Sequence, residues 1–140
     1  MPRAAVWELV SDPYSLPRWW PRTSRVEDVD PGEPAEGRQW TIVLQTTEGR
    51  GVRADFRCSA TVGEERYDWE QQIEGTPFER HLRRSTVEVR LSDSADEGTQ
   101  VGLSSVQALR GLSRLGGLLM RRGQGALLEE ALDGLERALL

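Results

Sequence analysis

The feature of this sequence that most constrains its fold is a regular alternation of apolar and polar side chains over residues 52–62. The apolar or small residues fall on every second position: Val52, Ala54, Phe56, Cys58, Ala60 and Val62. Arginine, aspartate, serine and threonine occupy the positions between them. A period of two is that of a β-strand with one buried face and one solvated face. The segment is therefore predicted to be a long strand with its apolar set turned toward a core.

Five further segments with the same period flank this strand. We place them at residues 25–29, 40–45, 67–73, 78–91 and 99–109, the first being weak. The intervening sequences are short: PGEPAEG, EGRG, VGEER, EGTP and SADEGT. Gly, Pro, Asp and Ser are the residues that favour turns. Six successive strands joined by short turns predict an antiparallel meander with one covered and one wetted face.

The two ends of the chain have a helical period instead. Near the N-terminus, residues 3–11 place Val6, Leu9 and Val10 on one side, and Asp12-Pro13 ends the pattern. Residues 13–16 read as one further turn, and residues 17–21 as a rigid aromatic corner. This corner contains Trp19 and Trp20, two of the five tryptophans in the chain.

A leucine stripe predicts a long C-terminal helix. Its members are Leu115, Leu118, Leu119, Leu128, Leu132, Leu135 and Leu139, widened by Leu127, Ala131 and Ala138. Five glycines interrupt this stretch, and each weakens an isolated helix by about 1 kcal/mol. Such a helix needs to dock its leucine face, and we expect it to lie across the sheet.

Composition limits the partners that the protein could have. The 140 residues, which suit one domain, carry 18 basic and 23 acidic side chains, a net charge of −5. An acidic chain is a poor non-specific ligand for nucleic acid, whose binding depends on neutralising phosphates. No apolar run approaches the roughly 20 residues that span a bilayer, so stable membrane insertion is not expected. The N-terminus has no signal-peptide core and the single Cys58 cannot form an intrachain disulfide, so a cytoplasmic location is expected.

Every basic residue in the chain is arginine, and the chain contains neither lysine nor asparagine. The codons of Lys and Asn are A-rich, so this absence favours a GC-rich bacterial genome. It also excludes catalysis through a lysine Schiff base and any triad that uses asparagine. One histidine and one cysteine offer no metal-ligand spacing, and no glycine-rich phosphate loop follows a strand. The sequence therefore predicts no metal and no cofactor.

The opening of the chain resembles one superfamily. The carrying sequences are VWELVSD at 6–12 and LPRWWP at 16–21, supported by TPFERHLRRSTVEVRLSDSADEGTQVGLSSVQALRG at 76–111. They are similar to the START-like superfamily, also called SRPBCC, and most to its bacterial polyketide cyclase/dehydrase-type members. The resemblance implies an α+β helix-grip fold, like that of the birch pollen allergen. In that fold a curved antiparallel sheet wraps around a long C-terminal helix and encloses an apolar cavity, with two short N-terminal helices.

The start of the chain departs from this family pattern. Family members have seven strands, the first of which precedes the first helix, whereas only Met1-Pro2 precede Arg3 here. We therefore expect a single START-like domain over residues 1–140 with six strands and without the first family strand. Either the start of the chain is truncated, or the last strand has an open edge, which invites pairing with another chain. The expected state is a monomer or a homodimer that pairs through this edge.

Strand parity and the resemblance predict which residues line the cavity. They are Trp19, Trp20, Trp40, Ile42, Phe56, Trp69, Gln71, Arg83, Val87, Leu103, Ser105, Gln107 and Leu119. Arg83 belongs to this set only if no β-bulge intervenes, because a bulge would turn it to solvent. Of Trp19 and Trp20, one is expected to pack under the C-terminal helix and the other to stand at the entrance. The sequence leaves open which does which.

Catalytic residues are not identified by any motif. His81 is the only histidine, and so the one group able to act as a general base near neutral pH without a shifted pKa. By the resemblance, Arg83, Ser85 and Tyr67 are candidates to polarise a ligand carbonyl. Cys58 lies on the apolar face of its strand, where a thiol is expected to be inert.

Three functions remain open at this point. The first is binding of a small hydrophobic molecule, such as a lipid, a polyketide or an aromatic metabolite. The second is a polyketide cyclase or aromatase that works without a cofactor. The third is a protein-interaction scaffold. A mainly apolar pocket favours binding, converging polar groups in that pocket favour the enzyme, and a dry core without a pocket favours the scaffold.

Overall fold

The computed structural model describes residues 2–46, 49–96, 98–109 and 114–139, of which 109 and 114–124 are described by their backbone only. Its strands form one antiparallel sheet in the order β1-β2-β3-β4-β5-β6, the meander that the alternation predicts. The strands are β1 Thr23–Glu27, β2 Gln39–Gln45, β3 Gly51–Val62, β4 Arg66–Gln72, β5 Leu82–Asp93 and β6 Thr99–Leu109. Within the described part of the chain, β1 and β6 are the edge strands of this sheet.

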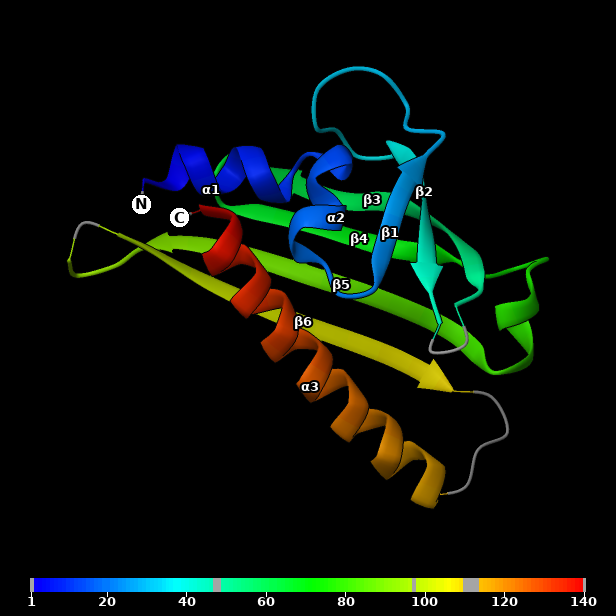
Figure 1. The fold of residues 1–140 in the computed structure, drawn as a ribbon. Helices are drawn as coiled ribbons and strands as arrows, with labels where there is room; N and C mark the ends of the chain where they lie inside the picture. Colours follow the sequence, from blue (N-terminus) through cyan, green and yellow to red (C-terminus); the bar gives the residue numbers. More distant parts are fainter. Residues whose placement is uncertain (1, 47–48, 97, 110–113, 140) are drawn as a thin grey trace.

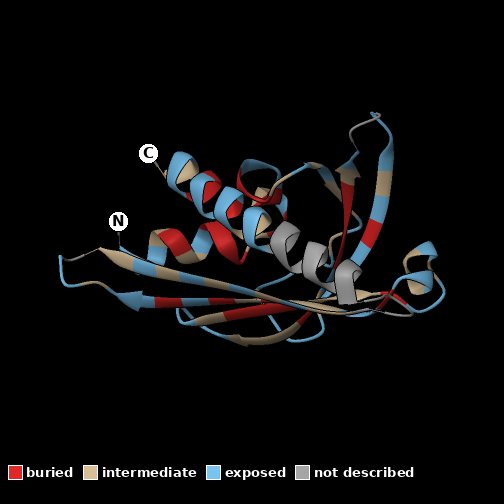
Figure 2. Cartoon of the chain, turned by 90° about the horizontal axis from the view of Figure 1, so that it is seen from below, coloured by how far each residue is buried: buried red, intermediate tan, exposed pale blue. Residues whose placement is uncertain are grey.

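The helices lie on one side of this curved sheet. They are α1 Arg3–Val10, α2 Leu16–Trp19 and α3 Arg114–Leu139, with 3-10 turns η1 Pro13–Ser15 and η2 Pro77–Arg80. The long α3 runs across the inner face, while α1 and α2 cover the same face beside its C-terminal end (Figures 1 and 2). This arrangement confirms the α+β helix-grip fold. No helix among the described residues has the length and apolar character needed to cross a bilayer.

Local sequence explains how the first helix ends and the next turn begins. The Ser11 hydroxyl donates to the Trp7 carbonyl at 2.6 Å, at the C-terminal end of α1. The Asp12 carboxylate then accepts from the Tyr14 N–H at 3.0 Å and so caps η1, whose first residue is Pro13. The Asp-Pro pair therefore separates two helical turns, which brings α2 and its tryptophans back toward the sheet.

Two strands differ from those expected by two or more residues. The strand placed at residues 78–91 begins at Leu82, because Pro77–Arg80 form the 3-10 turn η2. Pro77 has a fixed φ and no N–H, which suits the first position of such a turn and not a strand interior. The weak strand placed at residues 25–29 is Thr23–Glu27, and it ends before Asp28, whose φ is +51°.

A β-bulge at Ser59 reverses the expected orientation of the last residues of β3. Cys58 pairs with Trp69, but the next pair is Ala60 with Asp68, so Ser59 has no partner of its own. One extra residue shifts the side-chain alternation by one position. Val62 is therefore 48% exposed instead of facing the core. The prediction that Ala60 and Val62 share the inner face with Phe56 and Cys58 is wrong for this reason.

Aromatic rings form the centre of the core. The Trp69 ring on β4 lies against those of Trp19, Trp20, Trp40 and Tyr67, with centroid separations of 5.3–6.4 Å. All but one of these contacts are edge-on, a geometry that aromatic quadrupoles favour. The cluster joins α2 to the middle of the sheet, so the tryptophan-rich opening of the chain packs on the centre of the meander.

Helix α3 docks through small residues as well as leucines. Ala131 is fully buried and Leu135 is 3% exposed, whereas Leu132 is 37% exposed. Among the described members of the expected stripe, Leu132 is wrong, because the buried face is centred on Ala131, Gly134 and Leu135. The side chains of Leu115, Leu118 and Leu119 lie outside the described residues. A Cβ atom on Gly134 would lie 2.4 Å from the Trp19 carbonyl oxygen, so only glycine permits this approach of α3 to α2.

Candidate functional site

A pocket of about 460 Å³ opens between the inner face of the sheet and α3. This volume lies within the range of sites that hold small organic ligands. The described residues that line it are Trp20, Pro21, Arg22, Leu44, Gln45, Thr46, Val52, Phe56, Trp69, Gln71, Phe78, Ser85, Val87, Ser105, Gln107 and Leu127. They come from the corner after α2, from strands β2 to β6, from η2 and from α3.

The strand register assembles the floor of this pocket. Phe56 on β3 is paired with Gln71 on β4, and Trp69 is paired with Val87 on β5. Val87 is in turn paired with Ser105 on β6. Directly paired residues in an antiparallel sheet project to the same face. The alternation read from the sequence therefore places these five side chains side by side under α3.

One wall of the pocket is polar. The Gln107 side-chain N–H donates to the Ser85 hydroxyl at 3.3 Å, across the paired strands β5 and β6. The Gln107 Oε1 atom and the Gln71 Nε2 atom are buried, and neither has a hydrogen-bond partner among the described residues. A buried polar atom without a partner costs roughly 1–3 kcal/mol. The pocket thus presents one acceptor and one donor that a ligand group could satisfy.

Seven of the residues predicted to line the cavity line this pocket: Trp20, Phe56, Trp69, Gln71, Val87, Ser105 and Gln107. Four others belong to the packed core and not to the pocket lining: Trp19, Trp40, Ile42 and Leu103. The Leu119 side chain lies outside the described residues. The two neighbouring tryptophans have different surroundings. Trp19 packs beneath Gly134 of α3, whereas Trp20 lines the pocket.

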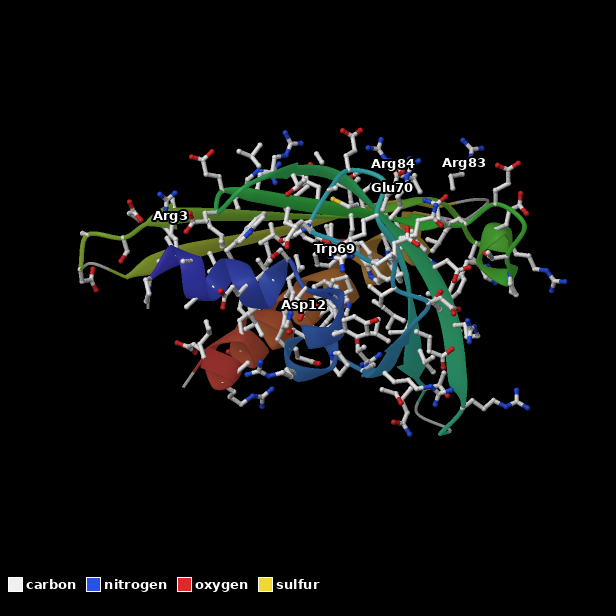
Figure 3. All side chains as sticks on the ribbon, turned by 90° about the horizontal axis from the view of Figure 1, so that it is seen from above. Arg3, Asp12, Trp69, Glu70, Arg83 and Arg84 are labelled. Atoms are coloured by element: carbon white, nitrogen blue, oxygen red, sulfur yellow. The ribbon has the colours of Figure 1, made fainter. Side chains whose placement is uncertain are left out.

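A second bulge removes Arg83 from the inner face. Leu82 pairs with Leu109 and Arg84 pairs with Ala108, so Arg83 is the extra residue. The buried side chain at this end of β5 is Leu82, while Arg83 and Arg84 are exposed on the outer side of the sheet (Figure 3). The placement of Arg83 in the cavity is therefore corrected. His81, at the end of η2, is exposed as well.

The other catalytic candidates have different surroundings. Ser85 lines the pocket and accepts the Gln107 hydrogen bond. Tyr67 is 2% exposed within the core, and burial of its hydroxyl raises its pKa above the usual value. Burial likewise raises the pKa of the Cys58 thiol to about 11, so this cysteine is a neutral core residue at physiological pH. No cluster of metal-ligating side chains occurs in the described part of the chain.

The strand parity also predicts inward side chains for Leu44 and Val52, and both line the pocket. The other lining residues have no such signal. Arg22, Thr46 and Phe78 come from turns and from η2, which have no periodic signal. Leu127 flanks the leucine stripe, but its position over the pocket depends on the crossing of α3, which no local pattern encodes.

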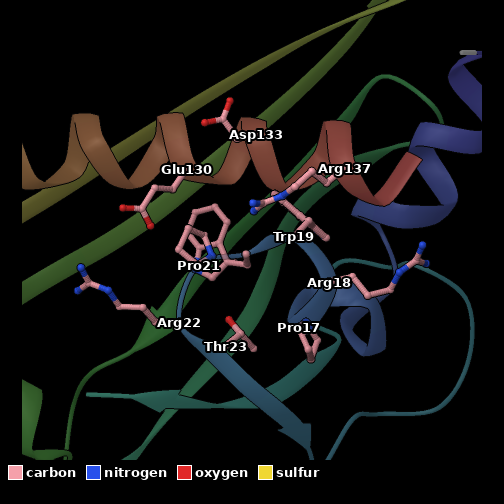
Figure 4. Close-up of a pocket in the computed structure, with 10 residues that line it drawn as sticks. Pro17, Arg18, Trp19, Pro21, Arg22, Thr23, Glu130, Asp133 and Arg137 are labelled. Carbon is pink, nitrogen blue, oxygen red and sulfur yellow. The ribbon is translucent and has the colours of Figure 1, made fainter. Parts of the chain in front are cut away.

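Three other depressions are lined by charged residues, and the smallest, of about 260 Å³, contains Glu8, Asp12, Glu33 and Arg38. One of about 450 Å³ lies at the α2 corner and is lined by Arg18, Arg22, Arg137, Glu130 and Asp133 among others (Figure 4). Another of about 660 Å³ lies between the β5–β6 turn and the end of α3 and includes Asp96 and Glu136. The pocket under α3 has a smaller volume than the depression of about 660 Å³. Among these pockets, however, it alone carries aromatic side chains from β3 and β4 and the two unpartnered amide atoms. It is the candidate binding site.

Comparisons with known proteins agree with this geometry. Residues 1–140 match the family described as "Polyketide cyclase / dehydrase and lipid transport". Protein NE0264 from Nitrosomonas europaea superposes with a TM-score of 0.68 at 19% identity, over 99% of this chain and 89% of that one. Ara h 8.0201 gives a TM-score of 0.71 at 16% identity, over 99% and 90%. A comparison with curated proteins gave no match.

A further similar structure belongs to a biosynthetic protein. The di-domain ARO/CYC StfQ from the steffimycin biosynthetic pathway gives a TM-score of 0.75 at 14% identity, over 99% of this chain and 49% of that one. Fold and pocket together define a helix-grip protein of the START-like class. The chain belongs to the polyketide cyclase/dehydrase and lipid-transport family of that class.

Proposed function

We propose that this protein binds a small hydrophobic molecule in the pocket between the sheet and α3. The observation that carries the proposal is the pocket lining, in which Phe56, Trp69 and Val87 form an apolar floor beside the polar wall of Gln71 and Gln107. Burying apolar ligand surface is worth about 25 cal/mol per Å², so 200–300 Å² of contact would supply roughly 5–7 kcal/mol. The two unpartnered amide atoms would fix the orientation of a carbonyl or hydroxyl group. A cytoplasmic location stays a prediction from the sequence.

A cofactor-independent cyclase is the second candidate, because polar groups from three strands converge on the pocket. Gln71, Ser85 and Gln107 could hold a ligand carbonyl in a fixed position, as such a reaction would need. None of them takes up a proton near neutral pH. The described lining contains no histidine, carboxylate, cysteine or tyrosine, so these residues supply no general base. Binding is therefore the better supported function, and the scaffold hypothesis has no comparable feature in its favour.

Titration with an uncharged fluorescent probe tests the proposal. N-phenyl-1-naphthylamine should bind the wild-type protein and gain fluorescence in the apolar pocket. Leu127 lines the pocket from α3, so Leu127→Trp should fill the space and weaken binding at least tenfold. Leu132 lies on the same helix, away from this pocket, so Leu132→Trp should bind as the wild type does.

Two results would contradict the proposal. The first is a wild-type protein, shown to be folded by near-ultraviolet circular dichroism, that leaves the probe in water. The second is equal loss of binding in the two tryptophan variants, because that would place the probe elsewhere on the protein. If the probe binds as expected, native mass spectrometry of the protein purified from its own host would identify the natural ligand by its mass.

A further inference from the structure

One arginine stands at the edge of the proposed binding pocket. Arg22, in the turn between α2 and β1, lines the pocket and is exposed to solvent. It is the only charged residue in the described lining, and no aspartate or glutamate faces it there. The protein as a whole is acidic, with a net charge of −5. Within the described lining, a single positive charge beside otherwise neutral side chains is therefore a local exception.

The Arg22 guanidinium is not neutralised by the rest of the described chain. Arg3, Arg25, Arg53, Arg57, Arg66 and Arg90 all form ion pairs with carboxylates, and Arg22 is not among them. Arg22 also borders the charged depression at the α2 corner, but it forms no ion pair with Glu130 or Asp133 there (Figure 4). Its donors are thus available to a bound group at the pocket mouth.

The backbone holds Arg22 in an uncommon conformation. Its φ is +60°, in the left-handed region that favours glycine, and a non-glycine residue there is destabilised by about 1 kcal/mol or more. The conformation is fixed because the Arg22 carbonyl accepts the Gln45 N–H at 2.8 Å, where β1 and β2 meet. Asp28 and Glu64 have the same left-handed φ away from this pocket, so the conformation fixes the position of the Arg22 side chain and is not by itself a sign of function.

We propose that Arg22 binds the carboxylate of an elongated apolar acid whose body lies in the pocket. This inference rests on the proposed binding function and specifies its ligand class. A guanidinium donates two parallel hydrogen bonds to a carboxylate, a geometry that suits a flexible arginine at an open rim. The aliphatic or aromatic body would extend over Phe56, Trp69 and Val87, and any internal carbonyl or hydroxyl would meet Gln71 and Gln107.

The test compares an acid with its uncharged counterpart. Laurate and dodecan-1-ol have the same chain length and differ in the charge of the end group. Each is used to displace N-phenyl-1-naphthylamine from the wild-type protein and from Arg22→Gln. The wild type should bind laurate more tightly than Arg22→Gln does, by about tenfold, because a charge-assisted hydrogen bond is lost. Both proteins should bind dodecan-1-ol equally.

Two further variants separate this role from general charge and from folding. Arg137 lines only the depression at the α2 corner, so Arg137→Gln should leave laurate affinity unchanged although it removes the same charge. Arg22→Gly relieves the left-handed backbone, so it should unfold at the same temperature as wild type or higher while losing laurate affinity. If Arg22 had only a structural role, its replacement by glycine would not lower laurate affinity while leaving the unfolding temperature unchanged or higher.

The possible results separate the assignment of Arg22 from the binding function on which it rests. If the probe and dodecan-1-ol bind but Arg22→Gln alters laurate and dodecan-1-ol alike, or alters neither, the assignment of Arg22 is overturned while the binding function stands. An equal loss of laurate affinity in Arg137→Gln would also overturn it, because net charge would then explain the effect. If neither the probe nor dodecan-1-ol binds, both the binding function and the Arg22 assignment are overturned.

Discussion

Single residues show how burial decides the chemistry of this protein. Cys58 and Tyr67 have side chains that carry out catalysis in other settings, but each is almost fully buried behind the pocket and belongs to the core. Burial raises the pKa of both groups, to about 11 for Cys58. The polar side chains of the pocket wall, Gln71, Ser85 and Gln107, are neutral throughout the physiological range, and Arg22 at the edge is the one charged residue of the described lining. These side chains would hold the proposed ligand by contact, by hydrogen bonding and by the Arg22 charge.

These raised pKa values predict that the protein loses stability in alkaline solution. The folded protein keeps the Cys58 proton up to a pH of about 11, whereas the unfolded chain releases it from about 9. The unfolded state therefore gains free energy of ionisation between these values, and stability falls as the pH rises through this window. Urea unfolding should show a loss of roughly 1 kcal/mol for Cys58 between pH 8 and pH 10.

Cys58→Ala is the control for this effect. Its unfolding free energy should fall less than that of the wild type between pH 8 and pH 10, with the remaining decrease coming from Tyr67 at the alkaline end. A wild-type protein whose unfolding free energy is flat or rises over this range would contradict the burial of both groups. The native thiol should also react slowly with a disulfide reagent at pH 8 and rapidly after unfolding.

At the scale of elements, the sequence predicts which segments are strands and helices better than it predicts side-chain orientation along them. The alternation of β3 and β4 correctly places Phe56, Trp69 and Gln71 on the inner face. The bulges at Ser59 and Arg83 reverse the orientation beyond them, and neither site contains a glycine or proline that would mark it. A bulge depends on pairing with the neighbouring strand, so local periodicity does not reveal it.

The docking of α3 on α2 is the second feature that depends on contacts distant in sequence. Gly134 appears in the sequence as a helix-weakening residue, yet it allows the closest approach of α3 to the Trp19 backbone. In Gly134→Ala a methyl group would meet a carbonyl oxygen at 2.4 Å, and both belong to backbone that moves only if the elements separate. We expect a loss of about 2 kcal/mol in unfolding free energy despite the better helix propensity of alanine.

Gly125 provides the matched control on the same helix. A Cβ atom there meets nothing within 4 Å, so Gly125→Ala should be neutral or stabilising by up to about 1 kcal/mol. Chemical denaturation of the two variants beside the wild type measures the difference directly. If Gly134→Ala proves as stable as Gly125→Ala, the close packing of α3 on α2 described here is incorrect.

For the whole molecule, the curved sheet and α3 do not fill the space between them, and that space is the candidate site. The fold follows from the sequence because the meander, the leucine stripe and the tryptophan-rich opening all specify the same architecture. The pocket can be predicted from the sequence only in part. Its floor consists of paired strand residues with a clear parity, whereas its rim consists of turn residues such as Arg22 and Thr46, whose positions depend on how the elements cross.

If the proposed function is correct, an apolar molecule occupies the space between the sheet and α3. Nuclear Overhauser effects between bound N-phenyl-1-naphthylamine and the valine and leucine methyl groups locate the probe residue by residue. We expect contacts to Leu44, Val52 and Val87, which line the pocket, and none to Val62 and Val106, which are exposed elsewhere on the sheet. Contacts to Val62 or Val106 without contacts to Val87 would contradict the proposed function.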